Sequence, residues 1–293
     1  VFQPLHNTWY NMLVILAITT MVIGNLFAIR QQNIKRFLAF SSIAQEVSAQ
    51  FVTSAKAVTS DWVESTLKKL TLEERVAQLV IPSTLGTYYA QDSDPWRELE
   101  RYVTKRKVGG LVLSIGDVYE YALMVNKLQK AADVPLLIAG DFEWGAAMRV
   151  RRATLFPRAM ALGATRNPGY AYEVGRVTAV EGRALGVHQN YAPTIDVNNN
   201  PRNPVINTRS YGDNVKLVTE MGTAFVRGTQ DAGMVATVKH FPGHGDTDVD
   251  THLGLVTLNY DKQHFDSTEF PPFRAAINAG AKSVMVGHIS LPA

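Results

Sequence analysis

Cysteine is absent from this chain of 293 residues, which excludes a disulfide framework, thiolate catalysis and cysteine-ligated zinc or iron–sulfur sites. An excess of either charge is almost absent too, since 29 Lys and Arg face 26 Asp and Glu. Three of the basic residues, Arg30, Lys35 and Arg36, lie in residues 1–45, where no acidic residue occurs. The rest of the chain is therefore neutral, and because it has no long basic cluster we expect no nucleic-acid partner.

Long uncharged runs are also rare, and residues 9–29 are the main exception. At about 1.5 Å per residue, this run can cross a hydrocarbon core about 30 Å thick. Trp9 and Tyr10 stand at one end and basic residues follow the other, which predicts a transmembrane helix with its N-terminus outside and a membrane contact through residues 9–29. A cleavable signal peptide fits less well, because no basic region precedes the run. A buried core helix is the remaining alternative.

Residues 24–45 read GNLFAIRQQNIKRFLAFSSIAQ. This stretch resembles part of the antiporter-like subunit N of NADH-quinone oxidoreductase, and the resemblance covers about residues 1–45. Those subunits are bundles of many transmembrane helices, so we expect no proton translocation by this chain. A membrane component related to that enzyme is the alternative function. The location follows the same choice: a membrane anchor if residues 1–45 belong to the protein, and otherwise the bacterial cytoplasm or periplasm.

After a linker at residues 46–60, the pattern changes to alternating helices and short buried strands. Asp61 can cap the first helix, and TLEE at residues 71–74 has the spacing of a capping box for the next. Apolar runs predict six strands, at residues 77–82, 109–114, 134–140, 188–197, 234–239 and 283–287. Helical stretches are predicted between them, at residues 118–132, 170–185 and 214–232.

This alternation predicts an α/β fold with parallel strands, and polar residues after each strand place a site at the strand carboxyl ends. We expect an incomplete (β/α)8 TIM-type barrel of about six β/α units, preceded by the one apolar transmembrane-like helix. A doubly wound sheet is the alternative. No Gly-x-Gly-x-x-Gly follows a predicted strand, so the sequence lacks the main signal for dinucleotide binding.

The polar segment after the fifth strand, KHFPGHGDTDVDTH at residues 239–252, is dense in His and Asp. A calcium loop starting at Asp246 is excluded, because its sixth and twelfth positions are Thr251 and Thr257 rather than Gly and Glu. A metal site through His240, His244 and a carboxylate is chemically reasonable, although its spacing matches no known zinc signature.

The third interpretation of this segment pairs Asp250 with His252. The carboxylate would accept one ring N–H and fix the tautomer, while the other ring nitrogen transfers protons near neutral pH.

At this point the chain resembles family 3 glycoside hydrolases, in particular their β-N-acetylglucosaminidase branch, where KHFPGHG followed by Asp-x-His is characteristic. PRAMALGAT at residues 157–165, APTIDVN at residues 192–198 and VMVGHISLPA at residues 284–293 belong to the same resemblance, which covers about residues 61–293. It implies a (β/α)8 barrel that removes terminal β-linked N-acetylglucosamine from peptidoglycan or chitin fragments with retention of configuration. It implies no metal ion and no cofactor.

The resemblance also implies the roles of individual residues. His252 would be the general acid/base, oriented by Asp250. The sugar in the −1 subsite would be bound by Asp141, Arg149, Arg209, Lys239 and His240. We expect Asp196 to be a buried structural carboxylate and His244 to hold its loop by hydrogen bonds, while His288 either lines the site or only packs.

The chain departs from the family pattern in two ways. Trp144 stands where the family usually has the first Gly of Asp-x-Glu-Gly-Gly, which makes the shape of that loop an open question. The family's nucleophile is an aspartate just after the seventh strand, and this chain ends at Ala293, just after the sixth. We therefore expect residues 1–293 to be catalytically silent or nearly so and poorly soluble through unpaired strand edges. A carbohydrate-binding protein without hydrolysis is a third hypothesis.

Overall fold

The computed structural model describes residues 61–249 and 254–291, which fall into two compact units divided between Val80 and Ile81. The predicted transmembrane segment 9–29, the linker 46–60 and the predicted dyad of Asp250 and His252 lie outside the described residues. Among the helices that the structure describes, none is long and apolar enough to cross a membrane.

The first unit contains α3 (Asp61–Lys69) and α4 (Leu72–Ala77). The predicted capping box is confirmed, since Thr71 Oγ1 accepts the Glu74 N–H at 3.2 Å and the Glu74 carboxylate accepts the Thr71 N–H at 2.8 Å. The strand predicted at residues 77–82 is wrong. Ala77 ends α4, and the N–H groups of Leu79 and Val80 continue the turn by bonding to carbonyl groups three residues earlier.

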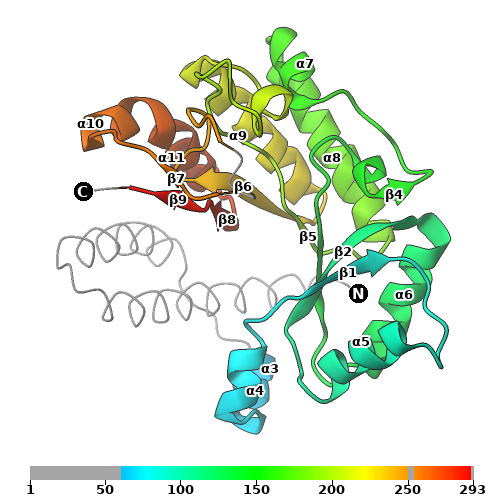
Figure 1. Cartoon of the computed structure of the whole chain (residues 1–293). Coiled ribbons are helices and arrows are strands. Elements are labelled where there is room, and N and C mark those ends of the chain that lie inside the picture. Colours follow the sequence, from blue (N-terminus) through cyan, green and yellow to red (C-terminus); the bar gives the residue numbers. More distant parts are fainter. Residues whose placement is uncertain (1–60, 250–253, 292–293) are drawn as a thin grey trace. The chain divides into compact units, whose positions relative to one another are not determined.

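The second unit is built on a parallel sheet with the order β1-β2-β3-β5-β6-β8 (Figure 1). The strands of this path are β1 (Ser83–Gly86), β2 (Gly110–Asp117), β3 (Leu137–Gly140), β5 (Gln189–Asn190), β6 (Val235–Phe241) and β8 (Ser283–Val286). Short β4 (Val150–Arg151) pairs with β2, and β7 (Val256–Thr257) pairs with β9 (Ile289–Ser290). Five of the six predicted strands are therefore found, whereas β1 lies outside every predicted range.

Helices separate the strands and follow one another along the sheet (Figure 1). They are α5 (Asp94–Thr104), α6 (Val118–Ala131), α7 (Ala159–Ala164), α8 (Pro168–Ala184), α9 (Val215–Asp231), α10 (Lys262–His264) and α11 (Phe270–Asn278), with the short turns η1 (Ala146–Met148), η2 (Asn207–Arg209) and η3 (Phe265–Glu269). The three predicted helical stretches correspond to α6, α8 and α9. This alternation confirms the α/β class with a parallel sheet.

Strand β5 is short because its continuation meets Pro193, which has no N–H to donate to a neighbouring strand. The chain nevertheless stays beside β6, since the Ile195 N–H bonds to the Lys239 carbonyl at 2.9 Å. This irregular run carries Asp196 toward the carboxyl end of β6.

Two apolar clusters hold the sheet and its helices together. One contains Leu111, Leu113 and Ile138 with side chains of α5 and α6, and the other contains Ala236 and Val238 with side chains of α8, α9 and α11. Both clusters include strand residues, so this packing fixes the strands whose carboxyl ends lead into the polar residues.

Candidate functional site

Lys239, at the carboxyl end of β6, is the centre of a buried group of charges. Its Nζ lies 2.7 Å from Glu143 Oε1 and 3.1 Å from Asp141 Oδ1. Both carboxylates come from the segment that directly follows β3. The side chain of Lys239 is only 3% exposed, so its charge is compensated by these carboxylates rather than by water.

Two further cations reach these carboxylates, Arg209 at Glu143 and Arg149 at Asp141. Arg209 donates to Glu143 through Nη2 at 2.7 Å and Nε at 2.9 Å, which is the two-point geometry that a guanidinium favours. Arg149 donates to Asp141 Oδ2 at 3.1 Å. Although burial on its own raises the pKa of Glu143, the charges of Lys239 and Arg209 outweigh it and lower that pKa to about 2.

His240 is oriented by Asp196, whose side chain is completely buried. The Asp196 carboxylate lies 2.7 Å from His240 Nδ1 and accepts the His240 backbone N–H at 3.1 Å. An ionised carboxylate can only accept, so Nδ1 carries the ring proton and Nε2 turns toward Arg209 Nη2 at 3.4 Å. Burial raises the pKa of Asp196, but His240 and the backbone donors outweigh burial and the net direction is downward.

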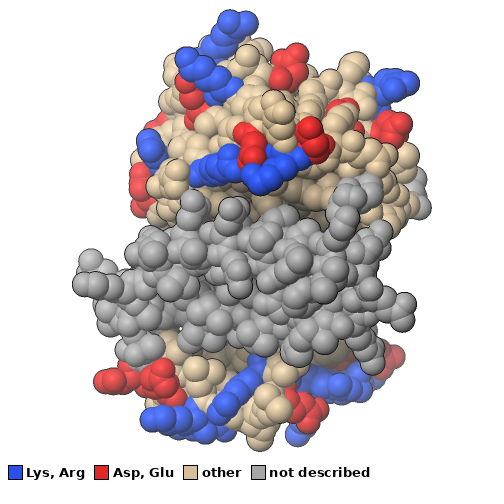
Figure 2. Space-filling model, turned by 90° about the vertical axis from the view of Figure 1, so that its left-hand side faces the viewer, with Lys and Arg blue, Asp and Glu red and all other residues tan. Residues whose placement is uncertain are grey.

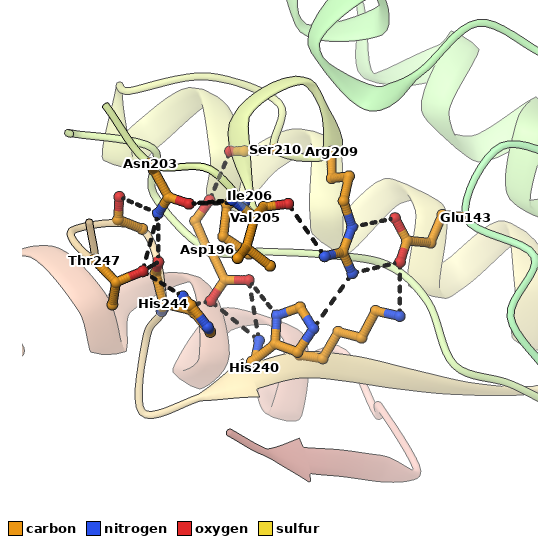
Figure 3. Close-up of polar contacts among 12 residues, drawn as sticks. Glu143, Asp196, Asn203, Val205, Ile206, Arg209, Ser210, His240, His244 and Thr247 are labelled. Atoms are coloured by element: carbon orange, nitrogen blue, oxygen red, sulfur yellow. Dashed lines mark hydrogen bonds and ion pairs between the residues drawn. The ribbon is translucent and has the colours of Figure 1, made fainter. Parts of the chain in front are cut away.

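The turn after His240 is held from inside by polar contacts (Figure 3). The His244 N–H donates to Asp196 Oδ1 at 2.8 Å, and His244 Nδ1 lies 2.6 Å from Thr247 Oγ1. Asn203 donates to the carbonyl groups of His244 and Gly245 at 2.7 and 3.0 Å. Asp196 is thus a buried structural carboxylate and His244 holds its loop by hydrogen bonds, as predicted.

Comparison with known proteins decides the family. The family described as "Glycosyl hydrolase family 3 N terminal domain" matches residues 71–293. This chain belongs to glycosyl hydrolase family 3. A second family, described as "NADH:quinone oxidoreductase/Mrp antiporter, TM", matches residues 1–70, in agreement with the resemblance of the N-terminal segment.

The chain is similar to a "Beta-N-acetylglucosaminidase/beta-glucosidase" of Cellulomonas fimi, with 39% identity over 79% of this chain and 40% of that relative's length. "Beta-hexosaminidase A" of Pseudoalteromonas piscicida is 39% identical over 67% of this chain and 35% of its own length. A solved family 3 β-N-acetylglucosaminidase from Paenibacillus sp. str. FPU-7 superposes with a TM-score of 0.71 at 41% identity, covering 76% of this chain and 43% of that one. The chain thus spans less than half the length of these relatives.

Within the second unit, the structure brings together the five residues expected in the −1 subsite, namely Asp141, Arg149, Arg209, Lys239 and His240. Glu143, which bridges Lys239 and Arg209, was missed as a site residue, although its place two residues after Asp141 at a strand end was a usable signal. His288 is exposed and follows β8.

Trp144 fits the loop without disturbing the charged group. The positive backbone angle falls on Gly145, with φ of 99°, so the second of the two positions where the family has Gly makes the turn. The Arg158 guanidinium lies 4.6 Å from the centre of the Trp144 ring, and Arg158 Nη1 donates to Thr208 Oγ1 at 3.1 Å. Trp144 is therefore held beside the pair of Glu143 and Arg209.

The alternative interpretation of residues 239–252 as a metal site requires His240, His244 and a carboxylate around one ion. In the part of the chain that the structure describes, no group of three His, Asp or Glu residues could hold a metal ion. The Nδ1 atoms of the two rings face Asp196 and Thr247 instead.

Proposed function

We propose that this chain carries the sugar-binding and acid/base residues of a family 3 β-N-acetylglucosaminidase, acting on terminal β-linked N-acetylglucosamine in peptidoglycan or chitin fragments. The observation that supports it best is the group formed by Asp141, Arg149, Arg209, Lys239 and His240, which the family resemblance assigns to the −1 subsite. The two relatives in Cellulomonas fimi and Pseudoalteromonas piscicida are named for this class of substrate.

The exposure of these side chains suits a sugar site. The side chains of Lys239 and Glu143 are 3% and 6% exposed and form the buried floor of the charged group. Those of Asp141 and Arg149 are 27% and 28% exposed and can be reached by a ligand. A carboxylate accepts hydrogen bonds from sugar hydroxyl groups, and a guanidinium donates to hydroxyl or N-acetyl oxygen atoms. Because Lys239 and Arg149 hold both oxygen atoms of Asp141, this carboxylate needs no reorganisation to receive a sugar.

The acid/base step in this proposal belongs to His252 and Asp250. The ring of His252 would protonate the glycosidic oxygen as the bond breaks and later take a proton from the attacking water, while Asp250 stabilises the imidazolium. Retention requires a nucleophile on the opposite face of the sugar, which the family resemblance places on an aspartate after the seventh strand of a complete (β/α)8 barrel. The closed barrel and the retaining course are part of this proposal.

Binding tests the sugar site without requiring turnover. Titration calorimetry with N-acetylglucosamine should give binding by the unsubstituted chain, and Lys239→Met should weaken it at least about tenfold, as expected for the loss of a charge-assisted contact. Lys216→Met is the matched control, because the Lys216 side chain is 84% exposed on α9. Absence of binding by the unsubstituted chain, or equal affinity of the Lys239 variant, would contradict the sugar site.

Hydrolysis of an aryl β-N-acetylglucosaminide tests the dyad. Because residues 1–293 are expected to lack the nucleophile, the assay uses a chain extended by its natural continuation. In that chain His252→Ala should lower the rate by about 100-fold or more with little change in affinity, because general acid/base catalysis contributes on that scale. Adding inorganic phosphate separates hydrolysis from phosphorolysis, since one similar structure at 30% identity is titled "Beta-glucoside phosphorylase BglX". Binding without any turnover by the extended chain would remove the hydrolytic function and favour a carbohydrate-binding one.

The membrane contact through residues 9–29 stays a prediction. Flotation of the full chain with lipid vesicles, compared with the same chain lacking residues 1–45, would test it. Equal distribution of the two forms would contradict an anchor in this segment.

A further inference from the structure

Glu269 is a buried carboxyl group that the proposed chemistry does not use. It ends η3, the π-helical turn that leads into α11, and only 1% of the residue is exposed. Neither carboxyl oxygen makes a hydrogen bond within the described residues, and the nearest basic atom, His264 Nε2, lies 3.8 Å from Oε1. Burial of an unpaired carboxylate is costly, so this site favours the neutral, protonated form.

The Glu269 side chain packs directly against the turn of the KHFPGHG segment. A Cβ atom placed on Gly243, whose φ is 138°, would lie 2.2 Å from Glu269 Oε2 and 2.8 Å from its Cδ. The carboxyl group therefore fills the space that a side chain at Gly243 would need. This turn connects Lys239 and His240 to the loop that carries Asp250 and His252.

The groups that face Glu269 come from three elements. Asp196 lies in the run after β5, Asp246 in the loop after β6, and His264 on α10. Asp246 accepts a hydrogen bond from the Tyr260 hydroxyl, and the Tyr260 ring stacks on His264 at 3.9 Å between centres.

These surroundings determine how Glu269 titrates. Burial, followed by the charges of Asp196 and Asp246, raises the pKa of Glu269 to about 8. The Asn199 amide is near enough to oppose this shift, but it does not meet hydrogen-bond geometry. In this conformation Glu269 is therefore mostly protonated at neutral pH.

We propose that Glu269 is a positioning residue whose neutral carboxyl group supports the turn at residues 242–249, so that closing this loop takes up one proton. Its bearing on catalysis rests on the proposed function, because the loop leads into the proposed acid/base dyad. The loop is held in the closed form at low pH and opens more often as the pH rises, since the open form lets water ionise the carboxyl group.

Hydrogen exchange of the full chain, read on peptides covering residues 242–249 and corrected for the intrinsic pH dependence, tests this proposal. Protection in the unsubstituted chain should fall by about tenfold per pH unit through the neutral range and level off near pH 8, because one proton is linked to closing. Glu269→Gln keeps the shape and cannot ionise, so its protection should be high and independent of pH. Glu220→Gln, a partly exposed position on α9, is the control and should follow the unsubstituted chain.

Two results would overturn the proposal: pH-independent protection in the unsubstituted chain, or weaker protection in Glu269→Gln than in that chain at pH 6. If Glu269→Gln does not fold, the profile of the unsubstituted chain alone decides. Sugar binding is measured on the same samples. A pH-linked loop in a chain that binds no N-acetylglucosamine supports the loop mechanism and rejects the proposed function, whereas sugar binding with a pH-independent loop rejects only the loop mechanism.

Discussion

Asp196 and His240 are 44 positions apart in the sequence, and the carboxylate of Asp196 lies 2.7 Å from Nδ1 of the His240 ring. The same carboxylate accepts the backbone N–H groups of His240 and His244. One buried anion thus fixes both the ring and the start of the turn that follows it. The rigidity of this part of the site depends on a residue that is not expected to touch the sugar.

Asp196→Asn should destabilise the protein by about 3 kcal/mol, because it removes a buried charge on which several donors converge. The amide can replace only one of the two accepting oxygen atoms. Urea denaturation measures the effect, and Asp213→Asn at an exposed position before α9 is the control. Equal stability of the two variants would show that Asp196 does not organise this region.

Glu143 predicts how stability changes in acid. Its pKa is about 2 in the folded protein against 4.5 as the ordinary value, so its contribution is present above pH 4.5 and is lost as the pH falls toward 2. The difference corresponds to about 3 kcal/mol as an order of magnitude. Glu143→Gln should remove this part of the acid dependence in denaturation curves from pH 2.5 to 7. An unchanged acid slope in the variant would contradict the assignment.

Glu269 predicts the opposite sign. Its folded pKa of about 8 lies above the ordinary 4.5, so its contribution is complete below pH 4.5 and is lost as the pH rises to about 8. Glu269→Gln should therefore flatten the alkaline side of the stability profile, and Glu143→Gln the acid side. Taken together, the contributions of these two groups are greatest near pH 4.5. An effect of Glu269→Gln on the acid side, or of Glu143→Gln on the alkaline side, would contradict the pKa shift of the residue replaced.

Gly245 predicts a steric effect in the same loop. A Cβ atom on Gly245 would lie 1.6 Å from the Val197 carbonyl oxygen, whereas a Cβ atom on Gly254 would meet nothing within 4 Å. Gly245→Ala should therefore cost about 3 kcal/mol or more through displaced backbone, and Gly254→Ala should change stability by less than about 0.5 kcal/mol. Thermal denaturation compares the two variants. Similar midpoints would mean that Gly245 does not pack closely against the Val197 carbonyl group.

The sequence predicted this fold best where local signals agreed. The capping box at Thr71, the three long helices and five of the six strands depend on periodicity and end signals that act over a few residues. The strand predicted at residues 77–82 failed because a short apolar run fits a helix end as well as a strand, and the preceding capping box had already started a helix.

The members of the charged group around Lys239 were predictable as a set but not as pairs. Position after a strand and family resemblance gave Asp141, Arg209 and Lys239, because strand ends in a parallel sheet share one edge. Position and resemblance did not predict that Glu143 bridges Lys239 and Arg209. That contact depends on how the side chains pack in the folded protein. Nor could spacing indicate that Glu269 lies under Gly243, a contact made by tertiary packing.

On the face in Figure 2, Lys and Arg are interspersed with Asp and Glu. The side chains of Lys216 and Lys262 are 84% and 78% exposed, so amine-reactive reagents can reach them. Lys239 differs from these because its amino group is enclosed between two carboxylates and is 3% exposed. Its acetylation should be far slower than that of Lys216 in the native protein and equally fast after denaturation. Mass spectrometry of the labelled chain would then measure how fast the carboxyl end of β6 becomes accessible, through one residue, Lys239.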